Sequence, residues 1–127
     1  MLKDSPAFSG FSVNDLDKAT EFYGKTLGLN AEKGPMGLKL SFKTGAEVFL
    51  YEKEDHVAAT FTILNFPVDD IDKAVDDLVA AGVTMERYDF AHQDDKGIAR
   101  GIAAKMGPYI AWFKDPAGNV LSVLKTD

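Results

Sequence analysis

Few side chains in this 127-residue chain could take part in chemistry, because it has two histidines, one tryptophan and no cysteine. His92 is followed by Asp94 and Asp95 in a polar stretch. An imidazole beside carboxylates could act as a general base or bind a divalent metal. The alternative is an ordinary surface histidine, which is also how we interpret His56.

Trp112 lies in a run of aromatic and aliphatic residues typical of a β-strand. Side chains of a strand point alternately to its two faces, so Trp112 shares a face with Ile110 and Lys114. Two interpretations fit this pattern. Trp112 either stacks on a ligand or belongs to the hydrophobic core.

The stretch 87–107 mixes charged residues with small ones. This composition predicts a loop that lies over a site, or alternatively a bulge without a role. Arg100 belongs to this stretch and could bind a carboxylate or phosphate group of a ligand, with a solvated surface charge as the simpler alternative.

Composition excludes several classes of function. Without cysteine there is no disulfide, no thiolate metal site and no cysteine nucleophile. The formal net charge of −6 disfavours nucleic acids and anionic membranes as partners, because binding them requires clustered Lys and Arg. No segment has the pattern of a signal peptide or a membrane helix, so we expect a cytoplasmic protein without a membrane partner.

A nine-residue segment occurs twice, as FSVNDLDKA from Phe11 to Ala19 and as FPVDDIDKA from Phe66 to Ala74. Six of the nine positions are identical, and the pair Asn14 and Asp69 retains a helix-capping side chain. Such a repeat indicates two copies of one structural unit. We therefore predict one module over residues 1–56 and a second over residues 57–127.

Each copy predicts a strand, an amphipathic helix and further strands. The first strands are expected over residues 8–13 and 60–68, and apolar residues at three- and four-residue spacing then predict a helix. The helices should end at Gly28 and Gly82, because glycine adopts the left-handed conformation of a C-cap. A short strand is expected after each glycine, and a hairpin then closes each copy: residues 37–44 with 47–51, and residues 108–114 with 120–125.

Two longer segments carry a family resemblance. FSVNDLDKATEFYGKTLGL near the start and GPYIAWFKDPAGNVLSVL near the end resemble motifs of the vicinal oxygen chelate superfamily of glyoxalases, bleomycin-resistance proteins and dioxygenases. The resemblance covers nearly the whole chain. It implies an α+β fold of two tandem βαβββ modules, whose largely antiparallel sheets form cup-shaped half-barrels around a small-molecule cavity. It also implies a homodimer.

Metal-dependent members of this family place His, Gln or Glu on the first and last strands. The family pattern HVxxxVxD puts Phe8 and Ile63 at the histidine positions. The pattern DPxGNxxE puts Ser122 at the glutamate position, and its counterpart in the first copy is Leu50 or Glu52. Of these residues only Glu52 is a usual metal ligand. We therefore expect no cofactor, with a divalent metal as the alternative.

Three functions fit these observations. The first is a family member that lacks the usual metal site and binds or acts on a small organic molecule. The second is a metal-dependent glyoxalase-like lyase, isomerase or dioxygenase with non-standard ligands such as Glu52 and His92, and the third is a structural or interaction module. For the first, the residues expected to contact the ligand are Phe8, Leu50, Glu52, Ile63, His92, Arg100, Trp112 and Ser122.

Overall fold

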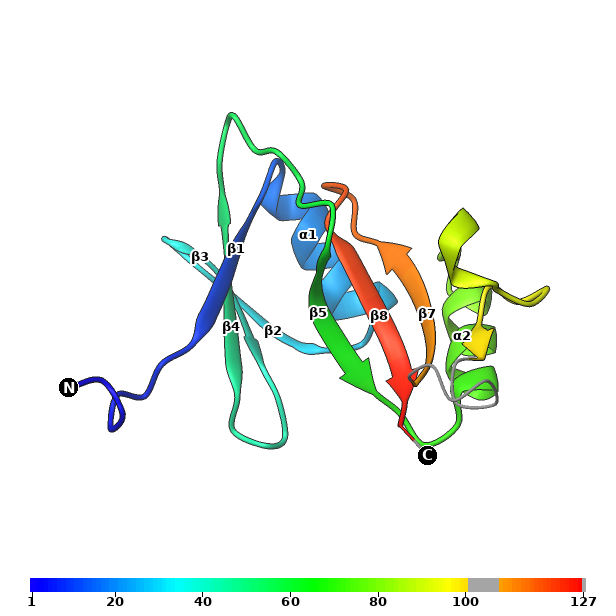
Figure 1. The fold of residues 1–127 in the computed structure, drawn as a ribbon. Coiled ribbons are helices and arrows are strands. Elements are labelled where there is room, and N and C mark those ends of the chain that lie inside the picture. Colours follow the sequence, from blue (N-terminus) through cyan, green and yellow to red (C-terminus); the bar gives the residue numbers. More distant parts are fainter. Residues whose placement is uncertain (101–107, 127) are drawn as a thin grey trace. The chain divides into compact units, whose positions relative to one another are not determined.

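The computed structural model describes residues 1–100 and 108–126 and consists of two compact units. Unit 1 is Met1–Val57 and unit 2 is Ala58–Asp127. Each unit contains one four-stranded mixed sheet and one main helix (Figure 1). The predicted tandem βαβββ organisation is therefore confirmed. None of the helices in the described part of the chain is long and apolar enough to cross a bilayer.

The sheet of unit 1 has the strand order β1-β4-β3-β2. Strand β1 pairs with β4 in parallel, and the other neighbours are antiparallel. The first and last strands of the unit therefore lie side by side, while β2 and β3 form a hairpin. The bounds of the strands are β1 Ser9–Val13, β2 Asn30–Gly34, β3 Gly37–Ser41 and β4 Glu47–Glu52.

The sheet of unit 2 repeats this topology with the order β5-β8-β7-β6, in which β5 and β8 are parallel. The turn between β7 and β8 is held by the buried Asp115, whose carboxylate accepts bonds from the backbone N–H groups of Ala117 and Asn119 at 2.9 Å. The bounds of the strands are β5 Thr62–Pro67, β6 Ala99–Arg100, β7 Tyr109–Lys114 and β8 Val120–Lys125.

The two main helices begin in the same way. Asp15 precedes α1 (Leu16–Glu21) and Asp70 precedes α2 (Ile71–Ala80). Each aspartate accepts a bond from the backbone N–H three residues further on, at 3.1 and 3.0 Å. These N-caps satisfy backbone donors that the first helical turn leaves free. The capping residue is thus the identical aspartate of the repeat, one position after the predicted Asn14 and Asp69 pair.

The helices end differently. After α1 the chain continues as a π-helical turn, Phe22–Thr26, in which Leu27 N–H donates to the Phe22 carbonyl at 2.9 Å. Gly28 and Gly82 follow the two helical segments with φ of 70° and 96°. Both predicted helix ends are therefore confirmed, because this left-handed conformation suits glycine.

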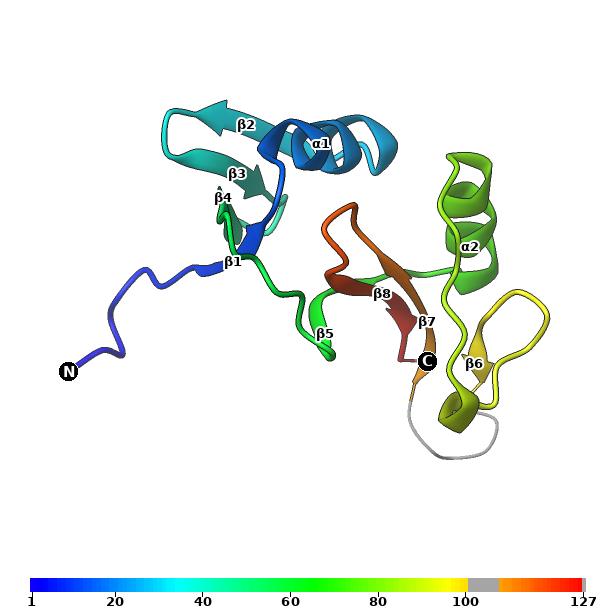
Figure 2. The same cartoon turned by 90° about the horizontal axis from the view of Figure 1, so that it is seen from above.

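We expected the second strand of unit 2 directly after Gly82, and the structure places it further along the chain. Met85 forms only an isolated bridge to Phe113, and β6 comes from the stretch 87–107 that we expected to be a loop. Figure 2 shows this stretch leaving α2, passing through a short 3-10 turn (Asp89–Ala91) and returning beside β7 as β6. Residues 101–107 of the expected loop lie outside the described residues. We call residues 87–100 the insertion.

Each sheet buries the face that packs against its own helix. In unit 1 this face carries Leu38, Leu40, Val48 and Leu50, and the completely buried Tyr23 contacts Phe11 beside them. In unit 2 the buried side chains of β7 and β8 pack with two buried residues of α2, and the set comprises Ile71, Val75, Ala111, Phe113, Leu121 and Val123. Alternation along the strands leaves a second face on each sheet.

Candidate functional site

Three aromatic side chains form a cluster on the face of the unit 2 sheet that points away from α2. Trp112 belongs to this face because its neighbours Ala111 and Phe113 are buried on the α2 side. The Tyr88 ring meets the indole edge-on with 5.4 Å between centroids, and the Phe90 ring lies 6.3 Å from the indole. We call Tyr88, Phe90 and Trp112 the aromatic cluster. Because Phe90 is 76% exposed, the cluster presents apolar surface to solvent.

Polar side chains lie beside the aromatic cluster on the same face. The register places Asn65 of β5 opposite Ser122 of β8, and Ser122 opposite Trp112 of β7. The buried Ser122 hydroxyl donates to Asn65 Oδ1 over 2.6 Å, and Trp112 Nε1 donates to Thr62 Oγ1 over 3.2 Å. Asn65 is exposed, so its side-chain NH2 group can donate to a bound molecule.

Gln93 holds the segment that carries Tyr88 and Phe90. Its Oε1 accepts the Tyr88 backbone N–H over 2.6 Å, and its Nε2 donates to the carbonyls of Glu86 and Gly97 over 2.8 and 2.7 Å. Burial, reinforced by the Glu86 carboxylate, raises the pKa of Tyr88 above its ordinary value. The phenol therefore stays protonated at neutral pH and can act as a hydrogen-bond donor.

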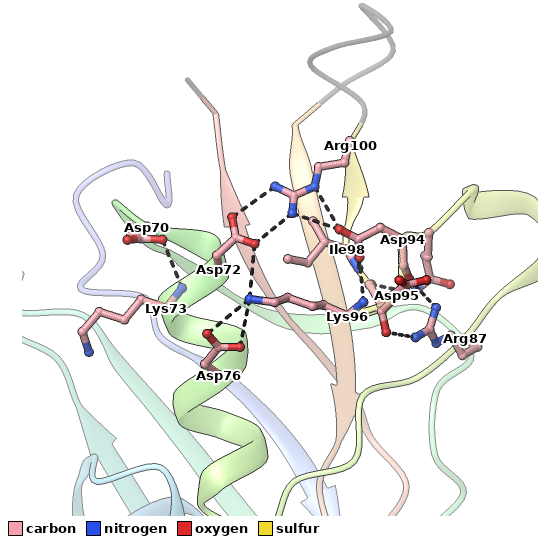
Figure 3. Close-up of polar contacts among 12 residues, drawn as sticks. Asp70, Asp72, Lys73, Asp76, Arg87, Asp94, Asp95, Lys96, Ile98 and Arg100 are labelled. Carbon is pink, nitrogen blue, oxygen red and sulfur yellow. Dashed lines mark hydrogen bonds and ion pairs between the residues drawn. The ribbon is translucent and has the colours of Figure 1, made fainter.

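Arg100 connects the insertion to α2 (Figure 3). Its guanidinium donates to both carboxylate oxygens of Asp72, at 2.9 and 3.2 Å, and to Asp94 Oδ2, at 2.9 and 3.1 Å. Lys96 adds a second connection, with Nζ 3.5 Å from Asp72 and 3.0 Å from Asp76. The sequence suggested that Arg100 contacts a ligand, whereas its guanidinium here binds two carboxylates of the chain itself.

Asp72 and Asp94 are ionised at neutral pH. The Arg100 guanidinium is the main cause of an Asp72 pKa below the ordinary value of 3.8. Partial burial acts to raise the pKa of Asp94, but hydrogen bonds from the Ile98 N–H and from Arg100 outweigh it, so this pKa is lowered as well. Asp72 in turn raises the pKa of Arg100.

The residues that the family patterns select in unit 1 do not form one site. Phe8 precedes β1 and is 67% exposed. Leu50 is fully buried on the face that packs against α1, so it lies in the core and not on a cup surface. Glu52 accepts a bond from the Leu16 N–H at 3.0 Å and thereby stabilises the start of α1.

Counting along the chain misplaces the corresponding position in unit 2. The register between β5 and β8 shifts between Thr62 and Leu64, so Ile63 lies at an irregularity of the strand. As a result Ser122 pairs with Asn65, whereas an unbroken register from the Thr62–Val120 pair would place Leu64 there. A one-residue irregularity of this kind moves every later side chain relative to a regular strand.

His92 and the aspartates that follow it were the predicted candidates for a metal site or a general base. His92 is exposed and adopts a left-handed conformation with φ 51° and ψ 54°. The Asp94 carboxylate accepts bonds from two backbone N–H groups, those of Lys96 and Ile98, and from Arg100. Within the described part of the chain, no three His, Asp or Glu side chains come together as a metal site.

A groove of about 620 Å³ lies between α2 and the segment 83–96. It does not include the aromatic cluster or its polar neighbours. It shows that apolar packing between α2 and the insertion is incomplete. Apolar and charged side chains both line it, and the main lining residues are Val75, Asp76, Val79, Val83, Met85, Arg87, Asp95 and Lys96.

Sequence reasoning did not identify Tyr88 and Phe90 as partners of Trp112, or Asn65 as the partner of Ser122. Two aromatic residues spaced by two in a polar stretch were the available signal for the first pair. For Asn65 the signal was a single amide inside an apolar strand. Buried or strand-bound polar residues usually have a specific hydrogen-bond partner.

Comparisons with known proteins agree with this fold. The model of the Glyoxalase/Bleomycin resistance protein/Dioxygenase superfamily matches residues 8–123. The uncharacterized protein YraH of Bacillus subtilis (strain 168) is 31% identical over 128 residues, which cover 89% of this chain and 91% of the relative.

Two solved structures illustrate the structural likeness. TnmS3, an antibiotic binding protein from Streptomyces sp. CB03234, has a TM-score of 0.67 and 22% identity, with 98% of each chain covered. FosX, a fosfomycin resistance protein from Listeria monocytogenes, has a TM-score of 0.69 and 14% identity, with 98% of this chain and 94% of FosX covered. These two show the fold, and the family match over nearly the whole chain shows the relationship. The chain belongs to the Glyoxalase/Bleomycin resistance protein/Dioxygenase superfamily.

Proposed function

We propose that this protein binds a small organic molecule with a planar part on the face of unit 2 that carries the aromatic cluster. The observation that carries the proposal is the exposed Phe90 ring, which packs with the part-buried rings of Tyr88 and Trp112. On the same face the exposed Asn65 amide lies one strand beyond Ser122, the residue paired with Trp112. Aromatic rings stack on planar ligands, and a few polar groups then fix the orientation. The names of TnmS3 and FosX, which refer to an antibiotic and to fosfomycin, support a small-molecule ligand.

The hydrogen-bonding groups define the kind of ligand. Trp112 Nε1 is already bonded to Thr62, so the indole offers its ring face and not its N–H. The protonated Tyr88 hydroxyl and the Asn65 NH2 group are both donors. The preferred ligand therefore combines a flat apolar part with acceptor oxygens, as in an aromatic carbonyl compound or an aromatic acid.

We also propose that binding does not use the divalent metal of the metal-dependent relatives. At the family's metal positions, Phe8 and Ile63 have no donor atom. The Ser122 hydroxyl donates to Asn65, and the Glu52 carboxylate binds the start of α1. These residues do not fit a divalent ion, which needs several oxygen or imidazole donors around it.

Trp112 fluorescence tests the proposal, because the chain has no other tryptophan. Chelator-treated protein is titrated with 8-anilino-1-naphthalenesulfonate, 2-naphthoic acid, bleomycin and fosfomycin. We expect saturable quenching by at least one planar compound. By calorimetry, Trp112→Leu should weaken the binding of that compound on the order of tenfold. Phe61→Leu, which removes an exposed aromatic side chain of the same unit outside the cluster, should leave the affinity unchanged.

Two results would contradict the proposal. One is the absence of saturable quenching with every compound, and the other is equal affinity in Trp112→Leu and the parent. Thermal unfolding with Ni, Co, Zn, Mn and Mg tests the metal part separately, because an ion that binds only the folded state raises its stability. A saturable rise with one ion would favour the metal-dependent enzyme instead.

A further inference from the structure

Charged contacts connect the insertion to α2 on the side where apolar packing is incomplete. Arg100 binds Asp72 through both carboxylate oxygens, and Lys96 lies within ion-pair distance of Asp72 and Asp76 (Figure 3). The groove lies between α2 and the segment 83–96 on this side. Ile98 is fully buried and anchors the end of the insertion next to β6. Gln93 and the bond from the Glu86 N–H to the Trp112 carbonyl hold the segment internally and to β7, and the charged network adds its connection to α2.

The turn at residues 94–98 connects the charged network to the aromatic cluster. Asp94 is bonded to Arg100 through Oδ2 and to two backbone N–H groups of its own turn through Oδ1. The Arg87 guanidinium donates to the carbonyls of Asp94 and Asp95. Because Arg87 directly precedes Tyr88, the turn and the aromatic segment move together.

We infer that Arg100, through Asp72 and Asp94, is a positioning residue that holds Tyr88 and Phe90 against Trp112 and thereby sets the affinity of the aromatic cluster for its ligand. The part of this inference that concerns affinity rests on the function proposed above. Arg100 itself does not contact the ligand. Its guanidinium is occupied by two carboxylates and lies over the Tyr109 ring, with 5.4 Å from Cζ to the centroid.

Arg100→Gln tests the inference because it removes the charge and keeps much of the side chain. Arg100→Lys keeps the charge but cannot form the forked contact with Asp72. Lys73→Gln is the matched control, since it removes an exposed ion pair of α2, that with Asp77, without touching the insertion. All variants are first compared with the parent by circular dichroism and thermal unfolding.

Two measurements need no ligand. One is hydrogen exchange of the backbone amides of residues 86–96, and the other is acrylamide quenching of Trp112. In Arg100→Gln we expect exchange about fivefold faster, as for a local opening that has lost an ion pair, together with stronger quenching. Arg100→Lys should lie between Arg100→Gln and the parent, and Lys73→Gln should match the parent. In 1 M NaCl the parent should approach Arg100→Gln, because salt screens the network.

The third measurement is the affinity for 8-anilino-1-naphthalenesulfonate, followed by energy transfer from Trp112. We expect a loss of about threefold or more in Arg100→Gln and none in Lys73→Gln. Parental exchange and quenching in Arg100→Gln would overturn the positioning role, and faster exchange with parental affinity would overturn its effect on binding. If the parent binds none of the compounds of the panel above, the proposed function fails while the ligand-free measurements still decide the positioning role. Asp72→Asn provides the same test if Arg100→Gln does not fold.

Discussion

The two units share one topology but differ at the same point of the sheet face that points away from the helix. Gly10 and Asn65 both precede the repeated phenylalanine, and they pair with Phe49 in unit 1 and with Ser122 in unit 2. In unit 1 the Phe49 ring lies against Gly37, where an added Cβ would be 2.7 Å from the ring. In unit 2 the pair is a hydrogen-bonded serine and asparagine beside Trp112. Unit 1 thus fills this position with its own ring, whereas unit 2 keeps polar groups there.

The second difference is the connection between the helix and the last two strands. In unit 1 it is a tight hairpin, in which β2 and β3 pair along their whole length. In the described part of unit 2, β6 pairs with β7 through two residues and Met85 adds an isolated bridge to Phe113. The insertion brings Tyr88 and Phe90 to Trp112. The repeated strands and helix therefore form the fold in both units. The connection that differs between the units supplies the candidate site in unit 2.

The largest effect that we predict concerns the position filled by Phe49. Gly37→Ala should lower the free energy of unfolding by about 3 kcal/mol or more, because the new Cβ would lie 2.2 Å from the Leu50 carbonyl oxygen at φ +154°. Gly45→Ala is the control, since it has a positive φ of +94° but no atom within 4 Å. It should cost only about 1 to 2 kcal/mol. Urea denaturation followed by circular dichroism measures the free energy of unfolding of both variants. Equal losses would show that Phe49 and Leu50 do not exclude a side chain at position 37.

A smaller effect distinguishes the two helix starts. Asp70→Ala should lower the free energy of unfolding by about 1 kcal/mol, as is usual for a lost N-cap. Asp15→Ala should cost less, because Glu52 still accepts the Leu16 N–H at the same helix end. Adding Glu52→Ala to Asp15→Ala should remove this advantage, because alanine has no acceptor for the Leu16 N–H. If urea denaturation shows the same loss in free energy of unfolding for Asp15→Ala and Asp70→Ala, Glu52 does not act as a second cap of α1.

The smallest predicted effect is a loss of folding stability at acid pH, which arises from carboxylates of unit 2. Folding lowers the pKa of Asp72, chiefly through Arg100, and also that of Asp94, so ionised carboxylates stabilise the folded state. This stabilisation is complete above the ordinary pKa of 3.8 and is lost as the pH falls through the lowered values. We therefore expect stability to decline between about pH 5 and pH 3, and to decline less in Arg100→Gln. Urea denaturation at both ends of this range measures the difference, and identical declines would assign the acid dependence to other carboxylates.

The elements of the repeat could be predicted from the sequence because local signals define them. Apolar periodicity, the repeated aspartates and the glycines at positions 28 and 82 predicted both helices and their ends. The strand hairpins were predicted to within a few residues for the same reason. The insertion was not, because β6 forms only through pairing with Tyr109 and Ile110, which lie further along the chain.

The candidate site was predicted only in part. Alternation predicted that Trp112 shares a face with Ile110 and Lys114, and left open whether that face is core or ligand site. The contacts of Trp112 with Tyr88 and Phe90 are non-local and leave no periodic signal. The strand irregularity after Thr62 shifted the position paired with Ser122. Arg100 was recognised as a cation in the insertion, yet its partner Asp72 lies on a different element.

The parallel pairing of the first and last strands has a consequence for how these units can change in length. Ser9 pairs with Val48 in unit 1, a separation of 39 residues (9 to 48), and Thr62 pairs with Val120 in unit 2, a separation of 58 residues (62 to 120). Chain-closure entropy grows only with the logarithm of the separation, so the longer loop costs about 0.4 kcal/mol more. This is less than the net contribution of a typical hydrogen bond. Each unit can therefore accept long insertions between its paired first and last strands. New binding surfaces can arise there without a large loss of stability.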